Sequence, residues 1–226
     1  MKAHSWKKVT GASGITFVVL FLVSLIISGE RPALDDSGAE LRQWFEDNES
    51  VVAWLTWSGA LSFALFFLLF ASGLRSILGP ADADNEGVWA RLSFAGAVVL
   101  VAIGGAGSAF WAVLAQEEVL SVASDETVKT LAAFDSIIFG AVVPWGVAVF
   151  LIGASVVILQ SGVMAKWLGW LGLLASLVIA IGTLWPFTGD DGHFLGVLTL
   201  VGMVAFLVWT LGASIAMIRS DSTSTT

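Results

Sequence analysis

One acid lies inside the most apolar stretch of the chain, residues 130–160. Asp135 stands early in this segment and Pro144 near its middle, and the remaining residues are almost entirely apolar. A carboxylate within a membrane-spanning segment is costly and needs a partner, water or a proton. Proline removes a backbone hydrogen bond and bends a helix, which membrane helices tolerate. Asp135 is therefore the first candidate for a functional site.

The partners of Asp135 must come from other helices, because Leu131 and Phe139 flank it one turn away on its own helix face. Side chains with a hydroxyl, indole or imidazole group are expected at a similar depth: Ser108, Trp111, Thr183, Trp185 and His193. Two interpretations follow. Asp135 is a protonatable site that couples to a proton or cation or anchors a polar ligand, or it is an interhelical hydrogen-bond hub.

A second set of potential ligands lies in the last polar turn. Asp190, Asp191 and His193 supply oxygen and nitrogen atoms, and with Glu117 or Glu118 they could bind a divalent cation. An acidic turn that caps a helix has the same composition, since acids favour the positive end of the helix dipole. The chain has no cysteine and only two histidines. We therefore expect no cofactor and no resident metal.

Enzyme motifs are missing from the sequence. It contains no nucleophile elbow, P-loop or dinucleotide-binding glycine fingerprint. The combinations of His, Cys and paired acids that catalyse most reactions are missing from the apolar segments. The net charge of −8 argues against a nucleic-acid partner, which requires clustered Lys and Arg. We expect a protein that is not an enzyme.

Composition indicates a membrane protein. Of the 226 residues, 57% are hydrophobic and 12% are charged, about half the charge of a soluble domain. The apolar residues form runs near the length that crosses a bilayer. We predict an all-α integral membrane bundle, a single domain over residues 1–218, with transmembrane helices at about 10–29, 51–77, 88–115, 130–160, 167–185 and 193–218. Residues 219–226 are expected to form a disordered tail.

Basic residues concentrate on one side of the predicted membrane. That side holds Lys2, Lys7, Lys8, Arg75, Arg91, Lys166 and Arg219, and the other holds Arg31, Arg42 and Lys129. The positive-inside rule then predicts a prokaryotic cell-membrane protein with both termini in the cytoplasm. Most acids fall on the outer side. The first apolar segment also fits a cleaved signal peptide, which is the alternative to a first transmembrane helix.

A short helix is predicted outside the membrane, over residues 37–48. Ser37 and Glu40 form a capping-box pattern at its start. Three apolar residues then recur on one face: Leu41, Trp44 and Phe45. The helix either covers the outer mouth of the bundle as a lid or rests on the membrane interface, where Trp is favoured.

The ends of the second, fourth and sixth predicted helices resemble one another. They read Leu74-Arg75-Ser76, Leu159-Gln160-Ser161 and Ile218-Arg219-Ser220. The fourth and sixth also share Gly153-Ala154-Ser155 and Gly212-Ala213-Ser214 at the same distance from those ends. Three parallel hairpin repeats, without the inverted symmetry of many transporters, would give this pattern. Interface chemistry, which favours Trp and Arg at helix ends, is the alternative explanation.

Short motifs along the chain resemble a group of uncharacterised six-helix membrane proteins that is frequent in actinobacteria and related prokaryotes. They are Asp35-Asp36-Ser37-Gly38-Ala39-Glu40 before Trp44-Phe45 and Asn48, then Leu74-Arg75, then Gly162-Val163 before Lys166-Trp167-Leu168-Gly169-Trp170. The resemblance covers nearly the whole chain. It implies a six-helix fold and no mechanism, because this group has no established activity.

Two functions are compatible with the sequence. The first is a non-enzymatic multi-pass membrane protein that binds a ligand or serves as an accessory subunit of a membrane complex. Its expected partners are membrane lipids, other membrane subunits or a small hydrophobic ligand. The second is a transporter or channel for protons, cations or a small solute, with Asp135 as the coupling acid.

Overall fold

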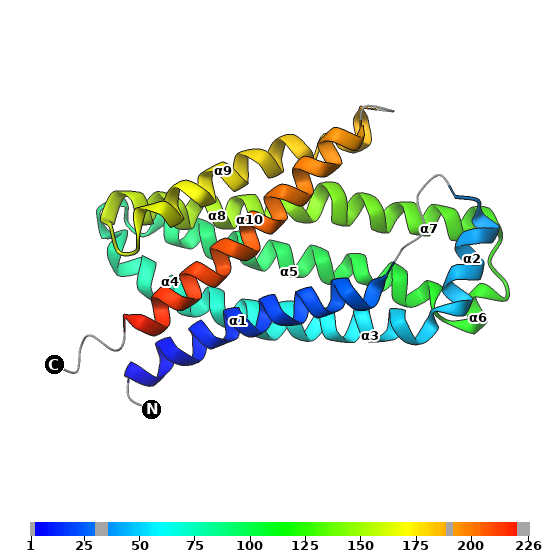
Figure 1. Cartoon of the computed structure of the whole chain (residues 1–226), viewed down its shortest axis with the longest axis horizontal. Helices are drawn as coiled ribbons and strands as arrows, with labels where there is room; N and C mark the ends of the chain where they lie inside the picture. The colour runs from blue at the N-terminus through cyan, green and yellow to red at the C-terminus, as the bar shows by residue number, and fades with distance from the viewer. Residues whose placement is uncertain (1–2, 30–35, 189–191, 221–226) are drawn as a thin grey trace.

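The computed structural model describes residues 3–29, 36–188 and 192–220, and six helices in this part are long and apolar enough to cross a membrane (Figure 1). They are α1 (Ala3–Ser28), the continuous helix α3–η1–α4 (Glu49–Ala60, Leu61–Phe67, Leu68–Ala81), α5 (Val88–Leu114), the continuous helix α7–η3–α8 (Asp125–Ile137, Ile138–Val142, Val143–Ser161), α9 (Lys166–Gly182) and α10 (Gly192–Arg219). The described residues contain no strand. The predicted all-α bundle of six membrane helices is confirmed.

The predicted helix limits and the structure differ by three residues or more at four ends. α9 ends at Gly182 rather than at 185. α1 begins at Ala3 rather than at 10. The helix predicted to end at 77 continues through Pro80 to Ala81. The helix predicted from 130 begins at Asp125, because the Ser124 hydroxyl caps it by accepting the Thr127 amide hydrogen (3.2 Å). Residues 221–226 of the predicted tail lie outside the described residues.

The long helices form a closed ring of three hairpins. α1 packs against α3–η1–α4, α5 against α8, and α9 against α10. The second helix of each hairpin then packs on the first helix of the next: α4 on α5, α8 on α9 and α10 on α1. Two matching serines make equivalent contacts, Ser155 of α8 with Gly172 of α9 and Ser214 of α10 with Gly14 of α1. This cyclic order agrees with three parallel hairpins.

Phenylalanine rings close the centre of the ring about halfway along α10. Phe67, Phe150 and Phe206 come from three different helices, and their centroids are 5.3, 5.7 and 6.2 Å apart. All three side chains are fully buried. Towards the end of the bundle that carries both termini, which we call the inner end, the core continues with buried side chains: Phe70, Leu74, Leu78, Trp209 and Met217.

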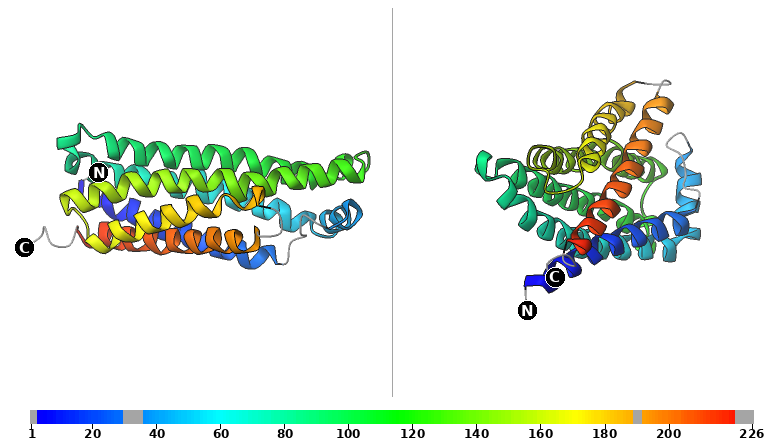
Figure 2. Two further views of the ribbon diagram at one scale, coloured as in Figure 1. Left: turned by 90° about the horizontal axis from the view of Figure 1, so that it is seen from above. Right: turned by 60° about the vertical axis from the view of Figure 1, so that its left-hand side comes forward.

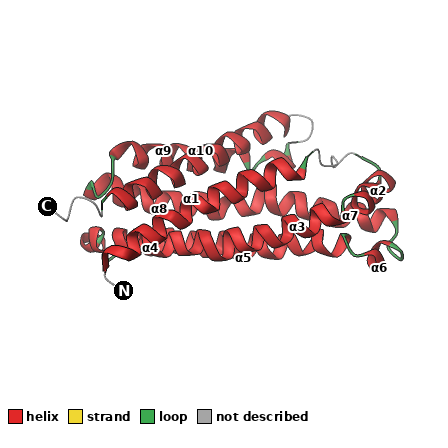
Figure 3. Ribbon diagram, turned by 60° about the horizontal axis from the view of Figure 1, so that its bottom comes forward, coloured by secondary structure: helices red, strands yellow, loops and turns green. Residues whose placement is uncertain are grey.

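A short helix, α2 (Gly38–Asp47), lies across the opposite, outer end of the bundle (Figures 2 and 3). The predicted capping box is present: the Ser37 amide donates to Glu40 Oε2 (2.8 Å) and the Glu40 amide to Ser37 Oγ (3.2 Å). Leu41 and Phe45 are buried in a second, smaller core with residues of α3, α5, α6 (Glu117–Leu120) and α7. The apolar stripe of α2 therefore faces protein, as in a lid, and not the membrane interface.

Arg42 fixes α2 to the connection between α6 and α7. Its guanidinium contacts Asp125 Oδ1 (2.9 Å) and donates to the carbonyl oxygens of Leu120 and Ala123. Lys129 of α7 donates to the Asp36 carbonyl oxygen (2.8 Å). We call α2, α6 and the adjoining ends of α3, α5 and α7 the outer cap.

Candidate functional site

Asp135 lies on the inward face of α7. Val128 and Ala132 precede it on the same helix face, and all three residues are buried, with Asp135 5% exposed. The adjacent Phe134, which points the other way, is 53% exposed. The carboxylate is therefore turned towards the protein and away from the side that faces lipid.

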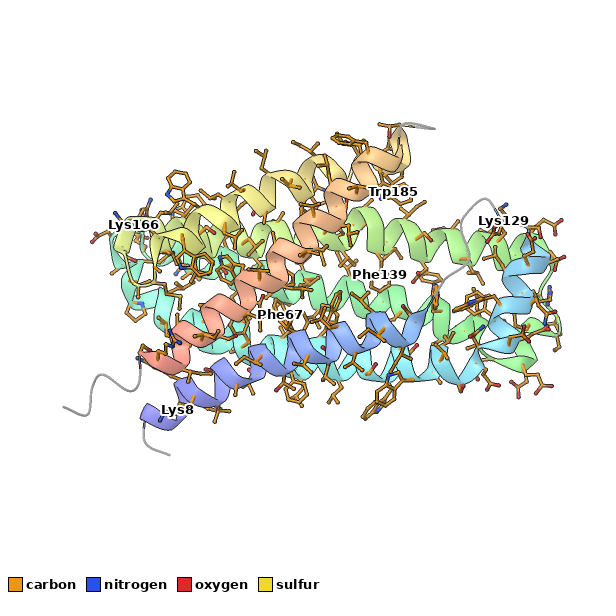
Figure 4. All side chains as sticks on the ribbon, in the orientation of Figure 1. Lys8, Phe67, Lys129, Phe139, Lys166 and Trp185 are labelled. Carbon is orange, nitrogen blue, oxygen red and sulfur yellow. The ribbon has the colours of Figure 1, made fainter. Side chains whose placement is uncertain are left out.

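The position of Asp135 along the long axis of the bundle follows from a contact about one helical turn closer to the inner end. Gly140 lies against the indole of Trp185, so close that a Cβ atom there would be 2.7 Å from Nε1. Trp185 belongs to η4 (Trp185–Phe187), the turn that follows α9. Figure 4 shows Trp185 and Phe139 at nearly the same position along the long axis of the bundle. Asp135 is five residues, roughly 7 Å, further out. It lies at the base of the outer cap and beyond the end of α9, not at the depth of the α9–α10 turn.

Trp111 is the predicted partner that the fold brings to the same level. Gly107 of α5 meets Ile138, and because α5 and α7 run antiparallel, Trp111 lies opposite Asp135 one turn further out. The Trp111 ring is 5.3 Å from both Trp44 and Phe45 of α2. The lid helix, the indole and the carboxylate therefore belong to one part of the outer cap.

Ser108 and Thr183 do not donate to Asp135. The Ser108 hydroxyl donates to the Gly104 carbonyl oxygen (2.9 Å), and the Thr183 hydroxyl donates to the Ala180 carbonyl oxygen (2.8 Å). Each hydroxyl has one hydrogen, which is already used by its own helix. The Asp190 and Asp191 positions and the His193 side chain lie outside the described residues. Elsewhere in the described chain, no three acids or histidines come close enough to hold a metal ion.

Two features mark the helix around Pro144. The proline is the second residue of α8 and follows directly on η3, a π-helical segment. Proline has no amide hydrogen, so one backbone hydrogen bond of the helix is missing. A π segment is a common way for a helix to accommodate such a missing bond. Phe139 lies in this segment, is 40% exposed, and lies against Gly107 of α5. The π segment η3 thus lies between Asp135 and Pro144.

Sequence reasoning missed an opening between the outer parts of α1 and α10. Near the inner end, Ser214 of α10 packs on Gly14 of α1. Gly196 lies five helical turns outward on the same face of α10, and a Cβ atom placed there would meet nothing within 4 Å. In Figure 1, α1 and α10 lie side by side near the inner end and diverge towards the outer end. The same face that packs on α1 at one end therefore meets open space at the other.

Gly59 of α3 is a second helical glycine of the outer half that meets open space. It follows Ser58, whose hydroxyl contacts the Ser24 hydroxyl of α1 (3.2 Å). It shares a helix face with Val52, which is fully buried, yet a Cβ atom on Gly59 would meet nothing within 4 Å. Along α10, no residue from Phe194 to Val201 is buried. We call the open faces of Gly59 and Gly196 together the outer opening. No sequence signal marks it, because the sequence does not show which helical glycines lack close neighbours.

A family model described as "Domain of unknown function (DUF4386)" matches residues 9–215. The chain belongs to this family. The match confirms the resemblance to uncharacterised membrane proteins and runs from α1 to α10, so the outer cap and the outer opening both lie within the region that the DUF4386 family shares. No curated protein and no solved structure matches the chain.

Proposed function

We propose that this member of the DUF4386 family is not an enzyme and that it binds a hydrophobic or amphipathic ligand in the outer opening. The observation that carries the proposal is the contrast between the two halves of the ring. Phenylalanines fill its centre halfway along α10, whereas Gly59 and Gly196 meet open space further out. Open space between helices beside a packed centre is a place where a molecule from the membrane can bind.

The borders of the outer opening favour a ligand with an apolar body. Phe21 and Phe63 stand one turn outward of the closed centre, with ring centroids 6.0 Å apart, and both are partly buried. Asp135 and Trp111 lie at the base of the outer cap, on the outer side of this space. A ligand with one polar group, oriented towards the cap, would match both the apolar floor and the carboxylate.

Native mass spectrometry of protein extracted gently from its own membrane tests this proposal. We expect a co-purifying lipid-like molecule in the wild type and its loss in Gly196→Leu, because leucine fills the outer opening. Gly105→Leu is the matched control, since Gly105 of α5 is also helical and without close neighbours. Both changes raise helix propensity by a similar amount, roughly 0.8–1 kcal/mol. A ligand retained in Gly196→Leu, or a wild type that carries none, contradicts the proposal.

Transport of protons, cations or a small solute is the second candidate. Asp135 supports it, because a buried carboxylate on an inward helix face is a common coupling acid. An opening on the outer side above a closed centre is also the shape of one state of an alternating-access transporter. In that case the contacts of Phe67, Phe150 and Phe206 must separate during each cycle.

We further propose that the protein spans a prokaryotic cell membrane with both termini in the cytoplasm. Lys8 and Lys166 lie at the inner end with the termini, and Lys129 lies at the outer end (Figure 4). The inner end also carries Arg75 and Arg219, near the ends of α4 and α10. An excess of basic residues on the cytoplasmic side supports this orientation.

A further inference from the structure

A groove runs along the outside of the outer cap, between α3 and α5. Its volume is about 300 Å³, and its walls are mainly small side chains. The lining includes Ala53, Thr56, Trp57, Ala60, Ala112 and Gln116. On α5, Gly105 and Ala109 are exposed and continue the face of Ala112 and Gln116 towards the inner end. The groove is therefore part of a longer strip along which another backbone could approach closely.

The outer end of the groove is acidic. A second hollow of about 380 Å³ adjoins it, and Glu49 and Ala115 line both. Glu46 and Glu117 also line this second hollow, and neither hollow is lined by a described Lys or Arg. The two hollows form one continuous surface that is apolar at its inner part and negatively charged at its outer part.

The position of the groove along the long axis of the bundle follows from the contact between α3 and α1. The contact of Ser24 with Ser58 sets one turn of α3 beside one turn of α1, and α1 ends at Ser28. Ala60 therefore lies within the span of α1, and Glu49 lies beyond its outer end. Trp54 and Trp57 stand beside the groove with ring centroids 5.7 Å apart and are 40% and 60% exposed. Exposed tryptophans are typical of the membrane boundary.

We propose that this groove docks a transmembrane helix of a partner protein that carries a Lys or Arg near its outer end. Small residues on both walls let a third helix approach closely, and close backbone approach is a main source of helix association in membranes. The acidic outer end supplies the complementary charge for a basic side chain just outside the hydrocarbon. The lining of the groove includes neither Gly59 nor Gly196, so either proposal can fail without the other.

A second copy of this chain does not fit the groove as well. Arg42 and Lys129 are the described basic residues of the outer end, and both are engaged within the chain. Arg42 contacts Asp125, and Lys129 donates to the Asp36 carbonyl oxygen. Among the described residues, a copy would therefore present acids and no unengaged base to the acidic end of the groove, which favours a partner of different sequence; Arg31 lies outside the described residues.

Binding of synthetic single-span peptides to the full chain in lipid nanodiscs tests the proposal. The probe is a leucine-rich helix with alanine at every fourth position of one face and one arginine at its outer end. Its two twins replace the arginine by glutamate or the alanines by leucine. The chain has no cysteine, so Ser50→Cys, exposed beside the groove, takes a single fluorescent label for energy transfer.

We expect the arginine peptide to bind about fivefold more tightly than the glutamate twin, the upper range for an exposed ion pair. Glu49→Gln combined with Glu117→Gln should remove this preference, and Glu126→Gln, an exposed acid of α7 outside the groove, should keep it. Ala112→Leu and Gly105→Leu should abolish binding, and Gly196→Leu should leave it unchanged. Because Gly105 faces open space, its leucine variant should fold even if Ala112→Leu does not.

Three results would overturn the proposal. They are equal binding of the arginine and glutamate peptides, full binding to Gly105→Leu, and displacement of the peptide by a simple cationic amphiphile such as dodecylamine. The last result would assign the groove to lipid. Loss of the co-purifying ligand in Gly196→Leu is read separately by mass spectrometry and does not bear on the groove.

Discussion

The polar residues of the long helices differ in where their hydrogens go. Ser108 and Thr183 donate to carbonyl oxygens of their own helices, and the Ser176 hydroxyl does the same with Gly172 (2.7 Å). Such local bonds satisfy a hydroxyl without any partner helix. A carboxylate has no donor unless it is protonated, so Asp135 cannot be satisfied in this way. Asp135 is therefore the polar residue of the long helices for which a functional role and a structural role predict different effects of mutation.

Asp135→Asn separates the two candidate functions. Asparagine keeps the size and one oxygen of the side chain and removes the charge. If the protein transports, wild-type proteoliposomes should show a proton- or ion-dependent flux that Asp135→Asn abolishes without unfolding the protein. If it binds a ligand, neither protein should show flux.

The matched control for this test is Asp82→Asn at the inner end. Asp82 is also buried, 1% exposed, and accepts the Ala90 amide hydrogen (3.0 Å) at the start of α5. We expect this change to lower stability by about 1 kcal/mol, as for a lost helix cap, and to leave any flux in place. Flux that survives Asp135→Asn would remove Asp135 from a coupling role.

Glu40 makes the start of α2 sensitive to pH. The hydrogen bonds that the Ser37 amide and hydroxyl donate to its carboxylate lower the pKa of Glu40 below 4.5, and Lys129 acts in the same direction. Because the folded pKa lies below the unfolded value, this contribution is present at neutral pH and is lost as the pH falls through the folded pKa. The protection of the α2 amides against hydrogen exchange, relative to the intrinsic exchange rate at each pH, should therefore decrease below pH 4.5.

Glu40→Gln is the control for this pH dependence. Glutamine can complete a capping box but does not titrate, so the protection of its α2 amides, relative to the intrinsic exchange rate at each pH, should change little across the same range. An acid-induced loosening of α2 that is equal in both proteins would mean that another group is responsible.

Among the elements, α2 depends on one side chain for its position. Arg42 contacts Asp125, which is 51% exposed at its side chain, and donates to two carbonyl oxygens of the α6–α7 connection. The exposed ion pair contributes little, about 0–1 kcal/mol. The carbonyl bonds matter more, because hydrogen bonds to a charged group contribute roughly 1.5–3 kcal/mol.

We predict that Arg42→Ala releases α2 from α7 while the six long helices stay folded. The opening free energy that hydrogen exchange reports for the α2 amides should fall by about 2 kcal/mol. Arg42→Lys should restore little, because an ammonium group lacks the planar fork that reaches several acceptors at once. Gln43→Ala, which removes only a contact with Asp47 on the same helix, is the control. Unchanged protection in Arg42→Ala would show that Leu41 and Phe45 hold α2 alone.

The sequence predicted the elements well because their signals are local. Run length and polarity gave the six long helices, and the Ser37–Glu40 spacing gave α2. The docking of α2 was undetermined between lid and interface, since it depends on Arg42 meeting Asp125 far along the chain. The fold places Trp111 at the level of Asp135, whereas the hydroxyls of Ser108 and Thr183 donate to their own helices. Depth along the sequence does not say whether a hydroxyl bonds to its own backbone.

For the whole molecule, orientation in the membrane is the first property to measure. The chain has no cysteine, so single-cysteine variants report one position each. Ser121, in the outer cap, and Ser220, at the end of α10, are both exposed. In intact cells a membrane-impermeant maleimide should label Ser121→Cys at once and Ser220→Cys only after lysis. The reverse pattern would invert the proposed orientation.

The shape of the bundle was the property furthest from the sequence. Three hairpins in one direction were suggested by the repeated helix ends, and the cyclic order of contacts agrees with them. The outer opening was not suggested by any motif, because it arises from the angle at which α1 and α10 cross. That angle is set by contacts of Gly11 with Ile218 and of Gly14 with Ser214, which no single segment reveals.

The crossing of α1 and α10 gives the bundle a pivot with unequal arms. The glycine contacts lie close to the inner ends of both helices, while Gly196 is 18 residues from Ser214, roughly 27 Å along α10. A rotation of about 5° at the pivot displaces Gly196 by roughly 2 Å, a large part of the width of a hydrocarbon chain. A methyl group on Gly14, far from any ligand, would therefore push α1 and α10 apart near their inner ends. The distance between the outer parts of the two helices would change with it.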